Sequence, residues 1–329
     1  MSNDAPTAPS LSSSDLFDVN GLVVVITGGG TGIGLMMAKA LENNGATVYI
    51  IGRRLKVLEE AAAKNNRYNK IIPLEGDITD RESLQRLATL VEERSGQVDL
   101  LINNAAIARN FFHHPLPSPD PTAPQASLAA FQSALWDTGT PDDFAASFAT
   151  NTTAVYYTTV AFLHLLYAAG NHTGLACNGS TPAENGAGPT ANPTPLSGPR
   201  PRPAQVISVA SSGAFRIDAG VLSPSYTLSK AACAHLGRVL ANLLAPWGIR
   251  SNVLAPGVWP TDMTTNPEPG VQLSPDVLAQ AVPLRRVGTE EDMAGTILFL
   301  ASRAAAYVNG AVWLVDGGRV GSLPSNYCP

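Results

Sequence analysis

Apolar runs alternate with amphipathic segments along most of this chain. The run LVVVIT at 22–27 is apolar up to its final threonine, which is typical of a strand buried on both faces of a parallel sheet. The next regular segment, 35–45, places its apolar residues at helical spacing and ends at Gly45. The full pattern predicts strands at 22–27, 47–52, 71–77, 98–104, 205–211, 249–256 and 311–316, with helices at 35–45, 54–65, 80–95, 141–169, 224–245 and 289–303.

This alternation of strands and helices predicts an α/β fold. Right-handed crossovers between parallel strands would give a doubly wound parallel sheet of the Rossmann type, with helices on both faces, in a single domain. We expect that domain to span 18–322. Residues 1–17 are rich in Ser, Pro and Ala, which indicates a flexible tail, and we expect a second tail at 323–329.

Two insertions interrupt the regular pattern. The first, 108–140, contains FFHHPLPSPDPTAP, which has too many prolines for a regular element. Because it follows a strand, it starts on the side where open parallel sheets bind ligands, and there it would cover a substrate. The second, 170–204, is dense in Gly, Pro, Asn, Thr and Ala and precedes a strand. We therefore expect a flexible loop at the far edge of the sheet, with no catalytic role.

Composition and charge exclude several classes of function. Hydrophobic residues make up 45% of the chain, enough for a sizeable core, and the net charge of −5 argues against nucleic acid as a partner. The three cysteines show no metal-ligand or disulfide spacing, and His113-His114 has no third ligand nearby, so we expect no metal. No apolar run is long enough to span a membrane, and no signal peptide is recognisable. These features predict a cytoplasmic protein that acts on a small molecule.

A cluster of glycines follows the first predicted strand and opens the first predicted helix. Gly28, Gly32 and Gly34 allow a tight turn and a close approach of the backbone to a pyrophosphate. The N-terminus of the helix adds unpaired N–H groups and the positive end of its dipole. Between a strand and a helix of a β-α-β unit, this loop predicts a dinucleotide site.

The end of the second predicted strand indicates which dinucleotide binds. A site that selects NAD offers an acidic residue there for the ribose 2′-hydroxyl. Here the strand ends in Gly52-Arg53-Arg54, and guanidinium groups suit bidentate pairing with a 2′-phosphate. The sequence therefore predicts NADP(H) as the cofactor, although one of the arginines would serve equally well as the exposed start of a helix.

These motifs resemble those of the short-chain dehydrogenase/reductase family. The family pattern TGxxxGxG corresponds to Thr27 through Gly34, and its Asn-Asn-Ala-Gly corresponds to Asn103-Asn104-Ala105-Ala106. Its Tyr-x-x-x-Lys corresponds to Tyr226 and Lys230, and its Pro-Gly turn with a downstream Thr corresponds to 256–261. The resemblance covers about 20–320 apart from the insertions and extends to carbonyl reductases and 3-oxoacyl-thioester reductases within the family.

The resemblance implies four catalytic residues. Tyr226 would protonate the carbonyl oxygen of a ketone during hydride transfer, and Lys230, one helical turn away, would lower its pKa. Asn151 would hold a water that links the lysine to solvent. Ser211 would polarise the carbonyl, with Ser212 as the alternative, because the spacing to Tyr226 is about two residues longer than is usual in the family.

The resemblance also implies most of the cofactor site. Asp77-Ile78 would contact the adenine, Asn104-Ala105-Ala106 the ribose and nicotinamide side, and the backbone of Trp259 with the Thr261 side chain the carboxamide. The residues predicted to bind NADP(H) are Gly28, Thr31, Gly32, Ile33, Gly34, Arg53, Arg54, Asp77, Ile78, Asn104, Ala105, Ala106, Tyr226, Lys230, Pro256, Gly257, Trp259 and Thr261.

The residues expected to reach the substrate are mainly apolar, which favours an apolar or aromatic ketone. They are Phe215, Ile217, Val221, Leu222, Trp259 and Met263, joined by Phe111 and Phe112 if the first insertion folds inward, with Arg216 as the charged candidate. Two other hypotheses remain: a binding-only NADP sensor, and a lyase or epimerase on the same fold. The resemblance further implies a homodimer or homotetramer that pairs the 141–169 and 224–245 helices.

Overall fold

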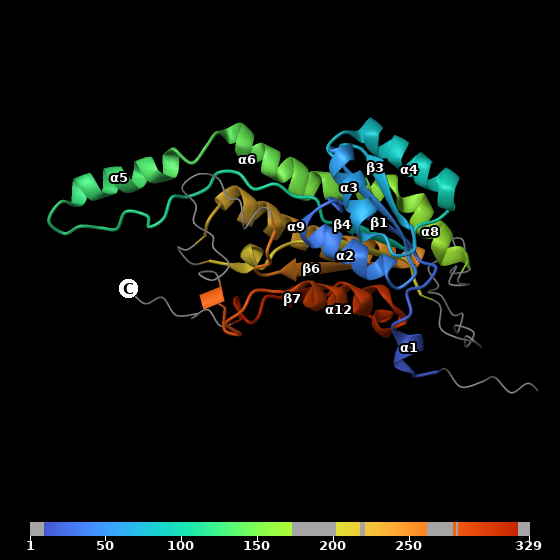
Figure 1. Ribbon diagram of the computed structural model, residues 1–329. Coiled ribbons are helices and arrows are strands. Elements are labelled where there is room, and N and C mark those ends of the chain that lie inside the picture. Colours follow the sequence, from blue (N-terminus) through green and yellow to red (C-terminus); the bar gives the residue numbers. More distant parts are fainter. Residues whose placement is uncertain (1–9, 173–201, 218–220, 262–278, 281, 322–329) are drawn as a thin grey trace, which may run out of the picture.

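The computed structural model describes residues 10–172, 202–217, 221–261, 279–280 and 282–321 (Figure 1). Three sequence-based expectations therefore concern residues outside the described part: the 170–204 insertion over 173–201, the 323–329 tail, and Met263 as a substrate residue.

Within the described residues, seven strands form one sheet whose neighbouring strands are all parallel. The strands are β1 (Val23–Thr27), β2 (Thr47–Gly52), β3 (Ile71–Glu75), β4 (Leu100–Asn103), β5 (Gln205–Val209), β6 (Arg250–Pro256) and β7 (Val312–Val315). Their order is β3-β2-β1-β4-β5-β6-β7. The predicted fold class is confirmed: a doubly wound parallel sheet in a single domain.

Two apolar layers cover the faces of this sheet. Side chains alternate along each strand, so Val24 and Ile26 of β1 pack into one layer and Val25 into the other. All three are fully buried, which explains the continuous apolar pattern of the strand. The first layer includes α2 (Gly32–Glu42), α3 (Leu55–Asn65) and α12 (Glu290–Ala301), and the second includes α4 (Arg81–Ser95), α7 (Ala154–Ala161), α8 (Leu163–His172) and α9 (Pro224–Leu244).

The strand order reverses at β1. From β1 the sheet extends through β2 to β3 in one direction and through β4 to β7 in the other. The connections that leave the carboxyl ends of β1 and β4 therefore diverge, and a crevice opens between them. Topology alone places the binding site at this edge.

The helix predicted at 141–169 is interrupted. It consists of α6 (Pro141–Phe148), a π-helical turn at Ala149–Thr153, then α7, and then α8 after Phe162. A π turn accommodates one extra residue, and such turns occur mostly at functional sites. One extra residue hardly changes the spacing of apolar residues along the sequence. The pattern therefore predicted a single helix where the structure has several elements.

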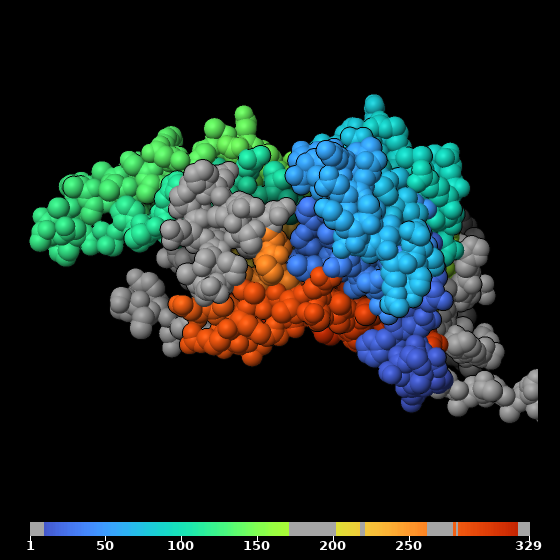
Figure 2. Space-filling view, in the orientation of Figure 1, coloured from blue at the N-terminus to red at the C-terminus, as the bar shows by residue number. Residues whose placement is uncertain are grey.

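The first insertion contains a helix that the sequence pattern did not predict. Residues 108–123 form neither helix nor strand, as their prolines indicated, but α5 (Pro124–Trp136) follows. None of the α5 side chains is buried, and the helix projects away from the body of the molecule (Figures 1 and 2). Without an apolar stripe that faces a core, α5 carries no strong helical pattern in the sequence.

The expectation of a flexible tail at 1–17 is wrong for its last residues. Helix α1 (Ser13–Leu16) is present, and the Arg303 side chain donates two hydrogen bonds to the Asp15 carbonyl oxygen, at 3.1 and 2.6 Å. The ring of Phe17 lies 6.5 Å from that of Phe299 on α12. An arginine donor and an aromatic contact thus hold this segment against the domain, whereas 1–9 lie outside the described part of the chain.

Asp292 caps α12, and we expect its replacement by asparagine to lower the free energy of unfolding by about 1 kcal/mol near neutral pH. Its carboxylate accepts hydrogen bonds from the Thr289 backbone N–H at 2.9 Å and from Arg286 at 3.0 Å. The Arg286 hydrogen bond is the largest cause that lowers the Asp292 pKa from 3.8 to about 2. The folded-state pKa of Asp292 lies below the unfolded one. The stabilisation by its carboxylate is therefore complete at pH values above 3.8 and is lost as the pH falls through about 2.

Urea unfolding at about pH 7 and about pH 3 measures this effect, and the difference between wild type and Asp292→Asn should shrink at the lower pH. Asp142→Asn on α6 is the matched control, since Asp142 is exposed and also lies in the first turn of a helix. A difference between wild type and Asp292→Asn that stays constant with pH would show that the capping carboxylate is not its source.

Candidate active site

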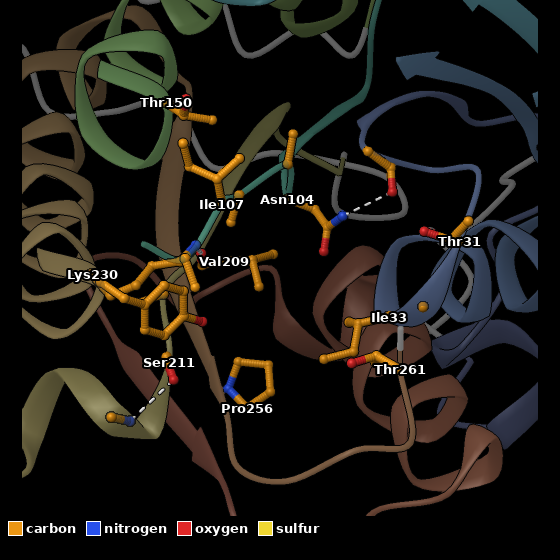
Figure 3. A pocket seen from close by; sticks show the side chains of 18 of the residues that line it. Thr31, Ile33, Asn104, Ile107, Thr150, Val209, Ser211, Lys230, Pro256 and Thr261 are labelled. Carbon is orange, nitrogen blue, oxygen red and sulfur yellow. Dashed lines mark hydrogen bonds between the residues drawn. The ribbon is translucent and has the colours of Figure 1, made fainter. Parts of the chain in front are cut away.

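A cleft of about 810 Å³ lies at the carboxyl edge of the sheet. Its walls come from the segments after β1, β2, β3, β4, β5 and β6 and from the first turns of α9. In Figure 3, Lys230 and Ser211 lie on one side of the cleft, and Thr31, Ile33 and Thr261 lie on the other. The cleft occupies the crevice that the strand order requires.

Asn104 fixes the glycine loop on the cofactor side of the cleft. Its side-chain amide donates to the carbonyl oxygens of Thr27 at 3.0 Å and Gly28 at 3.1 Å. The Thr27 hydroxyl in turn accepts from the backbone N–H groups of Asn104 at 3.0 Å and Ala105 at 3.1 Å. A Cβ on Gly28 would come within 2.9 Å of the Ala105 Cα, so only glycine permits this close approach.

The N-terminus of α2 is open toward the cleft. Its N-cap residue, Thr31, makes no side-chain capping hydrogen bond, and Thr31, Gly32 and Ile33 all line the cleft. The N–H groups of a first helical turn then point at the space where an anion binds, and the helix dipole favours negative charge there. This donor set fits a pyrophosphate.

The adenosine end of the cleft is cationic. Arg53 and Arg54 line it where β2 ends, and Arg54 is the N-cap of α3 without a side-chain capping bond. The carboxylate of Asp77 accepts hydrogen bonds from the Thr79 N–H at 2.8 Å and the Thr79 hydroxyl at 2.7 Å. Although burial opposes the shift, the pKa of Asp77 is lowered, by these bonds and by the nearby Arg53 charge. Asp77 therefore stays ionised beside the arginine.

Tyr226 and Ser211 meet at the other end of the cleft. Both line it, and the Ser211 side chain lies close enough to the Tyr226 phenol to lower its pKa. The Ser211 hydroxyl also accepts from the Gly213 N–H at 3.1 Å (Figure 3). Ser212 is 2% exposed, and Ser211 rather than Ser212 affects the Tyr226 pKa. Burial raises the pKa of Tyr226, and Ser211 partly opposes that rise.

Lys230 is buried below the tyrosine. Its ammonium donates to the Val209 carbonyl oxygen at 2.6 Å and lies 5.9 Å from the centre of the Tyr226 ring. Burial lowers the pKa of Lys230, and the same environment raises the pKa of the buried Cys233 thiol nearby. Burial is the largest cause of the raised Tyr226 pKa, and the expectation that Lys230 lowers this pKa stays a prediction.

Asn151 holds the π turn against the loop after β4. Its side-chain oxygen accepts from the Ile107 N–H at 2.9 Å, and its amide donates to the Ile107 carbonyl oxygen and to the Ser229 hydroxyl, both at 2.9 Å. The Ser229 hydroxyl donates to the Tyr226 carbonyl oxygen at 2.9 Å. The Asn151 side chain thus links three segments of the site and is fully buried.

Comparison with known proteins identifies the family. The family profile described as "short chain dehydrogenase" matches residues 22–182, and the one described as "Enoyl-(Acyl carrier protein) reductase" matches residues 195–319. A relative from Byssochlamys spectabilis, "Short-chain dehydrogenase/reductase VdtF", is 42% identical over 97% of this chain and 99% of its own length. "Short-chain dehydrogenase/reductase PhomF" from Diaporthe leptostromiformis is 40% identical over 97% of this chain and 98% of its own length.

The chain belongs to the short-chain dehydrogenase/reductase family. It is therefore an oxidoreductase that binds a nicotinamide cofactor. A solved structure, the "Pseudomonas aeruginosa RhlG/NADP active-site complex", is 27% identical, with a TM-score of 0.70 over 93% of this chain and 98% of the other.

The residues predicted from the family motifs converge on the cleft with few exceptions. Gly34 lies behind it, where a Cβ would clash with the Asn104 amide. The residues predicted for the cofactor that line the cleft are Gly28, Thr31, Gly32, Ile33, Arg53, Arg54, Asp77, Ile78, Asn104, Ala105, Ala106, Tyr226, Lys230, Pro256, Gly257, Trp259 and Thr261.

The expected substrate residues separate into two groups. Phe111, Arg216, Val221 and Leu222 line the cleft. The expectation for Ile217 is wrong, because its side chain is 96% exposed beyond the short helix Ser212–Phe215 and does not line the cleft.

Two further expected substrate residues do not line the cleft, and a third, Trp259, lines it although its side chain packs in the core. Phe215 and Phe112 do not line the cleft; the Phe112 N–H instead donates to the Leu222 carbonyl oxygen at 2.7 Å and so ties the first insertion to the loop before α9. The Trp259 indole is buried and donates to the Thr289 carbonyl oxygen at 3.0 Å, which holds it in the core beneath the cleft.

Two arginines that the sequence motifs did not predict also line the cleft: Arg109 and Arg319. Arg109 lies just after the Asn-Asn-Ala motif, so its position in the sequence could have indicated that it lies near the cofactor. Arg319 follows β7, and no motif in the chain marks it.

Among the described residues, no helix is long and apolar enough to cross a membrane, and no cluster of His, Cys, Asp or Glu is arranged to hold a metal ion.

Proposed function

We propose that this protein reduces a ketone to a secondary alcohol with NADPH. The observation that carries the proposal is that Tyr226 and Ser211 both line the cleft beside the buried Lys230 ammonium, with Ser211 close enough to affect the Tyr226 pKa. A binding-only sensor has no use for a buried lysine beside a phenol, since burying that charge costs free energy. A role in proton transfer explains why the protein keeps a lysine whose burial costs free energy.

Each catalytic side chain has a role in this reaction. The bound reduced nicotinamide would supply a hydride to the carbonyl carbon. Tyr226, held protonated by its raised pKa, donates its proton to the carbonyl oxygen, so the alcohol gains one hydride and one proton. Ser211 donates a hydrogen bond to the same oxygen, where negative charge develops. Lys230 stabilises the phenolate that Tyr226 becomes, and Asn151 positions α9 through Ser229.

The preference for NADPH rests on charge. Arg53 and Arg54 stand where an NAD-selective site would have a carboxylate, and the uncapped start of α3 adds N–H donors beside them. A guanidinium pairs bidentately with a phosphate but gains nothing comparable from a 2′-hydroxyl. The solved Pseudomonas aeruginosa relative is titled as an NADP complex, which supports this choice.

The loss of NADPH absorbance across a panel of ketones tests the proposal. Within that assay, Ser211→Ala should lower kcat about a hundredfold, the typical cost of one donor to a developing oxyanion. Ser212→Ala is the matched control and should leave kcat close to that of the wild type, because Ser211 is the serine that affects the Tyr226 pKa. The reverse ranking of the two variants would assign the carbonyl-polarising role to Ser212.

A further inference from the structure

The start of the first insertion pairs with the segment that leads into α9. The Phe112 N–H donates to the Leu222 carbonyl oxygen at 2.7 Å, and the His114 Nε2 atom lies 3.0 Å from the Val221 carbonyl oxygen. Val221 and Leu222 both line the cleft. The segments 109–114 and 221–225 are far apart in the sequence, and these contacts hold them together at the cleft, directly before Tyr226.

Two hydroxyl groups converge on the Arg109 carbonyl oxygen within this pairing. The Ser223 hydroxyl donates to that oxygen, and the Ser225 hydroxyl donates to it at 3.1 Å. A carbonyl oxygen has two lone pairs, so two donors use its full capacity. Ser223 is 3% exposed and Ser225 is fully buried, so both hydroxyl groups have protein atoms as their partners.

Ser223 connects this carbonyl to the backbone of the tyrosine. It is the N-cap residue of α9, and its hydroxyl oxygen accepts from the Tyr226 N–H at 3.1 Å. Capping needs only an acceptor, so an aspartate would cap the helix equally well. A serine has in addition a hydrogen to donate, and here that hydrogen goes to Arg109. One side chain thus joins the loop after β4 to the N–H of Tyr226.

Ser225 adds a connection from a third direction. Its hydroxyl lies 3.1 Å from the Ser147 hydroxyl, and Ser147 is a fully buried residue of α6. Because Ser225 directly precedes Tyr226, this contact and the contact with Arg109 act on the residue next to the tyrosine. The loop after β4 and α6 therefore both hold the first turn of α9.

The position of this first turn matters for the chemistry. The first N–H groups of a helix have no acceptor within the helix, so the turn depends on partners outside it. Tyr226 lies in this turn, and its phenol has to meet a substrate carbonyl with little positional error. A displacement of about 1 Å in a reacting geometry can lower a rate about a hundredfold. Contacts that fix the turn can therefore set the rate without touching the substrate.

We propose that Ser223 and Ser225 are positioning residues for proton transfer, which hold Tyr226 in place through the Arg109 carbonyl oxygen. The inference rests on the proposed ketone reduction, in which Tyr226 donates the proton. It gives the first insertion a role in catalysis through its backbone at Arg109, separate from any contact that its side chains make with a substrate.

Substitutions at the two serines separate positioning from capping. Ser225→Ala removes one donor to Arg109 and leaves the N-cap hydrogen bond in place, and it should lower kcat about tenfold. Ser223→Ala removes the other donor and the cap together, and it should lower kcat about a hundredfold. Ser223→Thr keeps a hydroxyl that can both accept and donate, so its kcat should lie well above that of Ser223→Ala. KM for the ketone and the dissociation constant for NADPH should stay close to the wild-type values in all three.

Ser302→Ala is the matched control. Ser302 is 1% exposed, and its hydroxyl donates to the Phe299 carbonyl oxygen at 3.0 Å at the end of α12, away from the cleft. The substitution therefore removes the same kind of buried hydrogen bond. Its melting temperature should fall about as far as that of Ser225→Ala, while its kcat per folded molecule should match that of the wild type.

A kcat for Ser225→Ala equal to that of Ser302→Ala would overturn the inference, since the buried hydroxyl would then contribute to stability alone. So would a Ser223→Thr variant no more active than Ser223→Ala, or a loss that appears in KM and not in kcat. The proposed reduction fails separately: Tyr226→Phe would then keep its activity. An inactive Tyr226→Phe beside fully active serine variants would remove only the positioning role.

Discussion

Replacing Tyr226 with phenylalanine should lower kcat for ketone reduction about a thousandfold, within the range typical of a lost general acid. The phenol lies beside Ser211 at the cleft, and its ring lies 5.9 Å from the Lys230 ammonium, so Tyr226 is placed to deliver the proton. The loss of NADPH absorbance under saturating substrate measures kcat. Fluorescence titration should show that NADPH still binds, because the ring that shapes the cleft remains.

Tyr157→Phe is the matched control. It removes the same hydroxyl group from a tyrosine on the exposed side of α7. Its kcat should match that of the wild type. A Tyr226→Phe variant that keeps most of its activity would show that the proton comes from elsewhere, and the proposed mechanism would then be wrong.

The pH dependence of the wild type follows from the direction of the Tyr226 pKa shift. Burial raises this pKa above its ordinary value of 10.0, so the phenol stays protonated at neutral pH. Reduction, which needs the protonated form, should therefore be insensitive to Tyr226 titration near neutrality. Oxidation of the alcohol needs the phenolate and should accelerate as the pH rises.

Replacing Arg53 with aspartate should raise KM for NADPH by about a hundredfold or more, because it removes a charge-assisted hydrogen bond and adds repulsion. KM for NADH should fall, since a carboxylate at the end of β2 accepts a hydrogen bond from the ribose 2′-hydroxyl. The ratio of kcat/KM for the two cofactors, with one ketone, measures the switch.

Arg94→Asp, in the exposed last turn of α4, changes charge by the same amount away from the cleft and serves as the control. Its cofactor preference should match that of the wild type. If Arg53→Asp behaves in the same way, the cofactor preference does not depend on Arg53, and the same substitution at Arg54 becomes the decisive measurement.

Most of the sheet was predictable because both of its faces are covered. Strand β1 is buried from Val24 to Thr27 and strand β4 along its whole length, so their apolar runs stand out from the amphipathic helices. The breaks in the 141–169 helix were not predictable, since the π turn around Asn151 changes hydrogen bonding without changing the residue types that face the core. The terminal helix α1 depends on a donor, Arg303, that lies far away in the sequence.

Some residues of the candidate site were predictable from the sequence and others were not. Motif residues such as Gly28, Asn104 and Tyr226 lie at carboxyl ends of strands or at starts of helices, so topology brings them together. Ile217 is adjacent to cleft residues in sequence, but the end of a short helix turns its side chain to solvent. Arg319 joins the cleft through the turn that Asp316 organises, and that arrangement exists only after β7 has joined the sheet.

Helix α5 has a consequence for how the stability of this protein is understood. With none of its side chains buried, α5 contributes little to the cooperative unfolding of the core. The free energy of opening α5 is independent of the free energy of global unfolding, so a melting curve of the whole protein does not report it. Substitutions in this segment can alter the local structure of the arm while the melting temperature stays constant, and amide hydrogen exchange reports the two stabilities separately.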